Sequence, residues 1–113
     1  MNTYTPDAWE IVLIDSIKHG KIYKILAGWY GGYMGSDSWK LSSGIESIAI
    51  EGDVFVMPQS SGSVYELHKD TNRMSSYMGM TYARFVEVAA PEDSGFTIGI
   101  VGIDEVLRVF GRT

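Results

Sequence analysis

Cysteine is absent from this chain of 113 residues, and proline occurs only three times. Without cysteine the chain can form no disulfide and no thiolate, so a cytoplasmic location is the simpler expectation. The first ten residues, MNTYTPDAWE, contain neither a basic stretch nor an apolar core and do not resemble a secretory signal. The longest apolar run, FTIGIVGI, is far shorter than the roughly 20 residues that span a bilayer. We therefore expect a cytoplasmic protein that does not contact a membrane.

Positive charge is also scarce. Nine Lys and Arg residues stand against fourteen Asp and Glu residues, which gives a net charge of −5. Nucleic-acid-binding proteins usually gather basic side chains on one face, where these displace counterions from the phosphates. The carboxylates form only two adjacent pairs, Glu92-Asp93 and Asp104-Glu105, which is too sparse for a DNA mimic. We expect no nucleic-acid partner.

The apolar residues occur in short runs that are typical of strands. The runs WEIVLID and IYKILAGWY are separated by the polar segment SIKHGK, and together they predict a β-hairpin. Further strands are predicted within WKLSSGIESIAI (39–50), VFVMP (54–58), VYELH (64–68) and FTIGIVG (96–102).

One longer segment has the periodicity of a helix. Asp70 or Asn72 can cap its start, and Pro91 ends it just after Ala90. Gly79 lowers the helix propensity by about 1 kcal/mol relative to alanine, and YARFVEV (82–88) can alternatively form a strand. The residues that share one helical face are Met74, Met78, Tyr82, Phe85 and Ala89.

These patterns predict one domain over residues 1–113 with an α+β fold. We expect a single antiparallel sheet of five to six strands, able to curl toward a barrel, with one main helix packed on it. The segment IDEVLRVFG (103–111) predicts a short second helix. A homodimer is also expected, because so small a domain with many aromatic residues can leave apolar area uncovered. Tyr77 and Met80 would contribute to such a patch if they lie outside the packed helical face.

The stretch AGWYGGYMGSDSW (27–39) concentrates glycine and aromatic residues in two tandem tetrads, GWYG and GYMG. It contains neither the dinucleotide-binding fingerprint nor a P-loop. Two interpretations stay open: a bulge or wide turn in the sheet, or an aromatic platform for a planar ligand or a partner's side chains. The candidate binding residues here are Trp29, Tyr30, Gly31, Gly32, Tyr33, Asp37, Ser38 and Trp39.

A Ser-Ser-Gly triplet occurs twice, at residues 42–44 and 60–62, each time beside a predicted strand. Such triplets commonly form turns. They can also present backbone N–H groups and hydroxyls to a phosphate or carboxylate. Ser61, Gly62 and Ser63 are therefore further candidate binding residues.

Catalytic and metal-binding signatures are incomplete. His19 and His68 have no partner at metal-ligand spacing, so we expect no metal and no cofactor. Ser61 or Ser63 could act as a nucleophile with His68 as the base, but the Gly-x-Ser-x-Gly motif is missing. We expect a non-catalytic protein, with a hydrolase as an alternative.

The segments GWYGGYMGSDSWKLSSGI, SGSVY and HKDTNRMSSYM resemble a set of small bacteriophage and prophage proteins with no established activity. The resemblance covers roughly residues 22–80. It implies a setting in which small proteins bind and block host proteins in the bacterial cytoplasm. The main hypothesis is therefore a binding protein that contacts a host protein through the aromatic and glycine-rich surface. The alternative, besides the hydrolase, is a protein that binds a small anionic or nucleotide-like ligand.

Overall fold

The computed structural model describes residues 2–31 and 36–111. Its helices are α1 (Ser76–Ala89) and α2 (Ile103–Phe110), and short 3-10 turns cover Lys69–Thr71 and Glu92–Ser94. The strands of this described part are β1 (Thr3–Tyr4), β2 (Ala8–Ser16), β3 (Gly20–Trp29), β4 (Ser38–Leu41), β5 (Ala49–Glu51), β6 (Val54–Pro58), β7 (Val64–His68) and β8 (Phe96–Val101). None of the described helices is long and apolar enough to cross a membrane.

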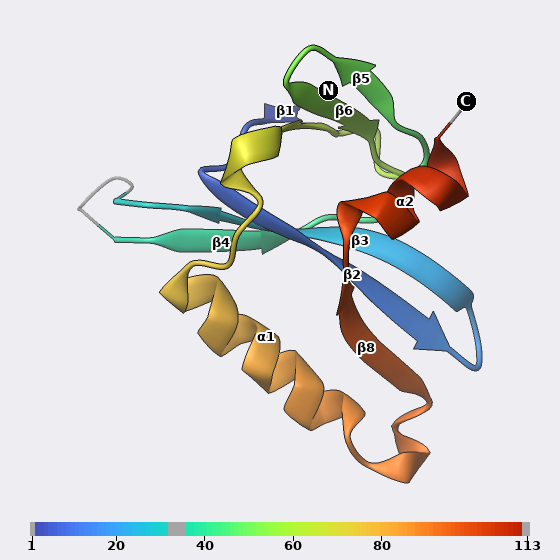
Figure 1. Cartoon of the computed structure of the whole chain (residues 1–113). Coiled ribbons are helices and arrows are strands. Elements are labelled where there is room, and N and C mark those ends of the chain that lie inside the picture. Colours follow the sequence, from blue (N-terminus) through green and yellow to red (C-terminus); the bar gives the residue numbers. More distant parts are fainter. Residues whose placement is uncertain (1, 32–35, 112–113) are drawn as a thin grey trace.

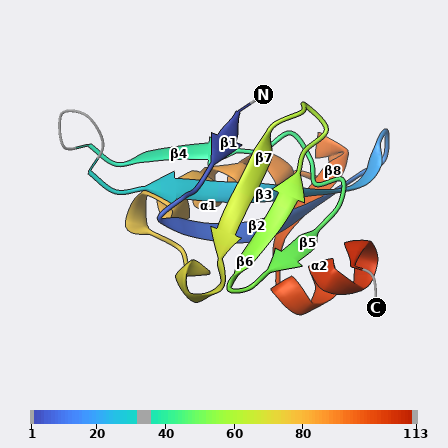
Figure 2. The same cartoon turned by 90° about the horizontal axis from the view of Figure 1, so that it is seen from above.

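The strands form two four-stranded sheets that face each other (Figure 1). The first sheet has the order β1-β7-β6-β5, and the second has the order β4-β3-β2-β8. All pairs are antiparallel except β1 with β7. The predicted hairpin is confirmed: β2 and β3 pair continuously from Ala8 opposite Gly28 to Ser16 opposite Gly20. Figure 2 shows that the strands of the first sheet run across those of the second.

The main core lies between the two sheets. Because side chains alternate along a strand, β2 and β3 point every second residue toward the first sheet, and β6 and β7 do the same in return. The helix α2 packs Val106 into this core. Figure 1 shows α2 beside the gap between the sheets. The buried strand residues of this core are Trp9, Ile11, Tyr23, Ile25, Ala27, Phe55, Met57, Tyr65 and Leu67.

A second, smaller core lies on the other face of the second sheet, where α1 packs. Val12 and Leu26 meet Met78 of α1 there. The approach is close because Gly28 has no side chain: a Cβ at that position would lie 2.5 Å from Met78 Sδ. The protein therefore has three layers, which are sheet, sheet and helix.

The α+β fold class is confirmed, but the expectation of a single sheet with five to six strands is imprecise. The described strands form two sheets of four, and they do not close into a barrel. The chain leaves the second sheet after β4 and enters the first sheet at β5, and an isolated bridge joins Ile45 to Gln59 in that crossing. Periodicity indicates which residues alternate in a strand, but it does not say which strands pair.

The main helix is confirmed, and residues 82–88 belong to it rather than to a strand. The predicted cap is wrong. Ser75 caps α1, and its Oγ accepts a hydrogen bond from Met78 N at 3.2 Å. The second helix is also confirmed, with Gly111 directly after it.

Candidate functional site

The glycine-rich stretch connects β3 to β4. Trp29 at the end of β3 pairs with Ser38 at the start of β4, so the residues between them form the hairpin connection. Gly32 and Tyr33 lie outside the described residues. Gly31 has a φ of +54°, which glycine adopts without the steric cost of a side chain. Its N–H donates to Asp37 Oδ1 at 2.9 Å, so Asp37 braces the connection from the other side.

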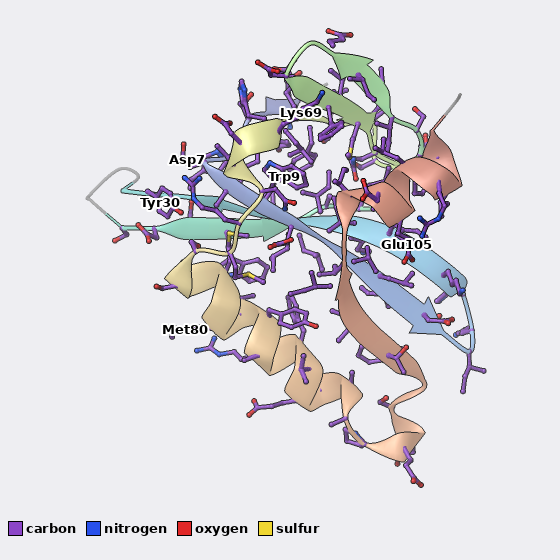
Figure 3. The ribbon with its side chains drawn as sticks, in the orientation of Figure 1. Asp7, Trp9, Tyr30, Lys69, Met80 and Glu105 are labelled. Carbon is purple, nitrogen blue, oxygen red and sulfur yellow. The ribbon has the colours of Figure 1, made fainter. Side chains whose placement is uncertain are left out.

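Tyr30 is held from two sides although it is 44% exposed. Its N–H donates to Asp7 Oδ2 at 2.9 Å, and its hydroxyl accepts from Arg73 Nε at 3.3 Å. The Arg73 guanidinium also lies 5.8 Å from the centre of the Tyr30 ring, which permits a cation–π contact. Figure 3 shows Asp7 and Tyr30 together at the base of this connection.

The two tryptophans of the stretch lie on opposite faces of the second sheet. Trp39 pairs with Gly28 on the face that carries α1, and its ring meets Phe85 edge-on with centroids 5.8 Å apart. Trp29 points to the other face, where its ring meets Tyr4 edge-on at 6.2 Å. The structure therefore separates these two rings, and they do not form one continuous platform.

The two Ser-Ser-Gly loops lie against each other. Ser60 N–H donates to the Gly44 carbonyl at 2.8 Å. Ser61 N–H donates to Ser43 Oγ at 3.0 Å. These bonds join the loop that follows β4 to the loop between β6 and β7, so the structure brings the repeated triplets together.

A cavity of about 310 Å³ opens beside these loops, and we call it the serine–lysine cavity. Within the described part of the chain, Lys24 and Lys40 are the only charged residues that line it. Ammonium groups and serine hydroxyls can donate hydrogen bonds to an anion. The full lining is Tyr4, Lys24, Lys40, Leu41, Ser42, Ser43, Ser61, Ser63 and Tyr65.

Tyr65 adds a buried phenol to this cavity. The residue is only 1% exposed, and its ring centroid lies 5.1 Å from that of Tyr4. Burial, with a smaller contribution from Tyr4, raises the pKa of Tyr65 to about 12, so the hydroxyl is neutral near pH 7 and can donate. Tyr65 belongs to the lining of the cavity, so its phenol is among the groups that a bound ligand can meet.

No family model, curated protein or solved structure matches this chain. The resemblance to phage proteins stays a prediction.

Gln59 has a buried side-chain oxygen without a hydrogen-bond partner in the described part of the chain. The residue is buried just before the second Ser-Ser-Gly loop. Its Nε2 donates to the Met57 carbonyl at 2.8 Å, whereas Oε1 is a buried oxygen with no partner in the described part of the chain.

The serine–histidine pair of the hydrolase alternative is not assembled. Ser63 lies just before β7 and His68 ends it, opposite Val54. Five residues of extended strand span about 16 Å, which is too far for a hydrogen bond between the two side chains. His19 lies in the β2–β3 turn. In the described ranges, no group of three or more His, Cys, Asp or Glu residues could hold a metal ion.

Sequence reasoning selected Ser61 and Ser63 but missed Tyr4, Lys24 and Lys40. It missed Tyr65 as well. The only available signal was a lysine inside an otherwise apolar strand, IYKILAGWY, where a charge needs either solvent or a purpose. The four missed residues come from four different strands, and only the packing of the two sheets brings them together.

Proposed function

We propose that this protein binds a small anionic ligand, carrying a phosphate or carboxylate group, in the serine–lysine cavity. The observation that carries the proposal is the charge of the lining. Lys24 and Lys40 are its only charged residues in the described part of the chain, although the protein as a whole has a net charge of −5. Because the described lining presents two ammonium-bearing side chains and no carboxylate, an anion bound there would meet only positive charge.

The arrangement of hydrogen-bond donors supports the same function. Lys40 Nζ lies 5.3 Å from the centre of the Tyr4 ring, which holds the ammonium group beside the cavity. Serine hydroxyls and the Tyr65 phenol can donate to further oxygens of the ligand. A cavity of about 310 Å³ is at the small end of the range for ligand pockets, so we infer a compact anionic group.

Binding without catalysis is favoured because His68, the base of the hydrolase alternative, lies about 16 Å along the strand from Ser63. Ser43 Oγ already accepts from the Ser61 backbone, and Ser61 Oγ accepts from Ser63 N at 3.4 Å. These serines therefore support the shape of the two loops as well as their polarity.

Isothermal titration calorimetry with pyrophosphate at low ionic strength tests whether the cavity binds an anion. We expect one site per chain, and we expect Lys40→Gln to weaken binding about tenfold or more, because hydrogen bonds to charged groups are worth about 1.5–3 kcal/mol. Lys69→Gln is the matched control: Lys69 lies over the Phe55 ring, outside the cavity lining. Equal weakening by both substitutions, or no binding by the unmodified protein, would show that the cavity is not an anion site.

A second candidate function is binding of a host protein beside the β3–β4 connection. Tyr30 is 44% and Trp39 38% exposed, and the Arg73 guanidinium lies 5.8 Å from the centre of the Tyr30 ring. Tyrosine, tryptophan and arginine are the residue types most often found at the centre of protein interfaces.

Cross-linking in host lysate followed by mass spectrometry tests this candidate. We expect a specific partner that Tyr30→Ala and Trp39→Ala lose and that Lys40→Gln retains, because Lys40 lines the cavity instead. The candidate is rejected if capture is unaffected by both aromatic substitutions.

The homodimer stays a prediction. Tyr77 and Met80 are exposed on α1, and Figure 3 shows Met80 on the side of α1 that faces away from the sheets. This is the position in which a self-association patch was expected.

A further inference from the structure

An apolar groove of about 600 Å³ adjoins the serine–lysine cavity. Its apolar residues are Ile14, Ile17, Ile22 and Phe96, and we call it the isoleucine groove. Ile14 pairs with Ile22 across β2 and β3, and Phe96 pairs with Ser16. Because side chains alternate, Ile14 and Ile22 lie on the face of the second sheet that carries α1. Figure 1 shows the β2–β3 hairpin extending past α1, so the helix does not cover this part of the face.

Lys24 links the groove to the cavity, since it lines both. Ile22 lies two residues away on the same face of β3, a distance of about 7 Å along the strand. The other basic residues of the groove are Lys18 and His19, and no acidic residue belongs to its described lining. The serine–lysine cavity and the isoleucine groove are therefore both lined by basic residues. The cavity presents hydroxyl groups, whereas the groove presents aliphatic side chains.

We propose that the ligand is an anionic amphiphile whose charged group occupies the serine–lysine cavity and whose alkyl chain lies in the isoleucine groove. This inference rests on the proposed function and specifies its ligand class. An anion alone would leave the groove empty and its aliphatic floor in water. Ile17, which is 90% exposed, would gain a partner from an alkyl chain.

The charge of the lining selects this occupant. A neutral lipid would make no use of the lysines that line the cavity and groove, and a cationic amphiphile would be repelled by them. A compact anion would use the lysines but none of the apolar surface. An alkyl chain that ends in a carboxylate or phosphate group uses both.

Calorimetric titration with acetate, hexanoate and decanoate tests the inference. A fully buried methylene tightens binding about fourfold, so we expect decanoate to bind at least tenfold more tightly than hexanoate, with one molecule per chain. Decyl phosphate in a parallel titration distinguishes a phosphate head from a carboxylate head. Lys40→Gln should weaken the binding of both decyl compounds about tenfold.

Ile17→Ser and Phe96→Ser should reduce the ratio of decanoate to hexanoate affinity, because both residues line the groove. Ile17 is so exposed that its substitution should not affect folding, and Ile50→Ser, an exposed position on β5, is the matched control. Affinity that does not depend on chain length would overturn the amphiphile but leave the anion site intact. Decanoate binding that survives Lys40→Gln unchanged would also overturn it, because the chain would then bind without its head in the cavity. Failure of pyrophosphate and all carboxylates to bind would overturn the proposed function itself.

Discussion

Replacing Trp9 with alanine is expected to lower the free energy of unfolding by about 3–5 kcal/mol, because the substitution removes a fully buried aromatic side chain from the main core. Trp9 projects from β2 into the space between the sheets (Figure 3). Its ring meets Phe55 of β6 edge-on at 6.1 Å, and its Nε1 donates to the His68 carbonyl at 2.8 Å. One side chain thus joins the second sheet to two strands of the first.

Urea denaturation followed by circular dichroism measures this loss. The variant Trp9→Phe separates the contribution of apolar packing from that of the hydrogen bond. The smaller ring retains much of the apolar contact, whereas the His68 carbonyl loses its donor. We expect Trp9→Phe to cost about 1–3 kcal/mol. Trp39→Ala is the control, since Trp39 is partly exposed on the outer strand β4 and should cost less than Trp9→Ala. Equal losses at the two tryptophans would mean that the two sheets are not joined through Trp9 as described.

The local part of the fold was predictable because it depends on neighbours in the sequence. The spacing of Met74, Met78 and Phe85 identified α1, and alternation identified β2 and β3. The division into two sheets was not predictable, since it depends on contacts such as that between Trp9 and Phe55, which are far apart in the chain. The strand β1 has only two residues and pairs in parallel with β7, so it carries no periodic signal.

The error at the helix cap has a specific cause. Asn72 was a suitable capping residue by type, but its Nδ2 donates instead to the Trp9 carbonyl at 2.9 Å and to Glu10 Oε1 at 3.1 Å. Burial raises the pKa of Glu10, and the hydrogen bond from Asn72 partly opposes this shift. Asn72 is thus occupied by β2, and the next suitable residue, Ser75, caps the helix.

The candidate site was predictable only where a motif repeats. The two Ser-Ser-Gly triplets indicated their loops, and the loops do meet through Ser61 and Ser43. Lys24 and Lys40 carried no motif, because their convergence depends on where β3 and β4 end relative to the first sheet. A cavity formed between sheets is a property of packing, and the order of residues along one strand does not contain it.

Gly28 is the first glycine of the tandem tetrads, and its replacement by alanine is expected to destabilise the protein by about 1–3 kcal/mol. The new Cβ would lie 2.5 Å from Met78 Sδ and 3.3 Å from Ser75 Oγ, so either the methionine or the start of α1 has to move. Met78 is fully buried in the second core and has little room to do so.

A double-mutant cycle distinguishes this steric cause from a general intolerance of Gly28 to substitution. Met78→Ala alone should cost about 2–5 kcal/mol, because it leaves a cavity under β3. The double variant Gly28→Ala/Met78→Ala should cost at least about 0.5 kcal/mol less than the sum, since the new methyl group then enters that space. Additive losses in urea denaturation would contradict the contact. Coupling would show that Gly28 is needed for the close approach of α1, whereas Gly31, with its positive φ, is needed for the turn that follows.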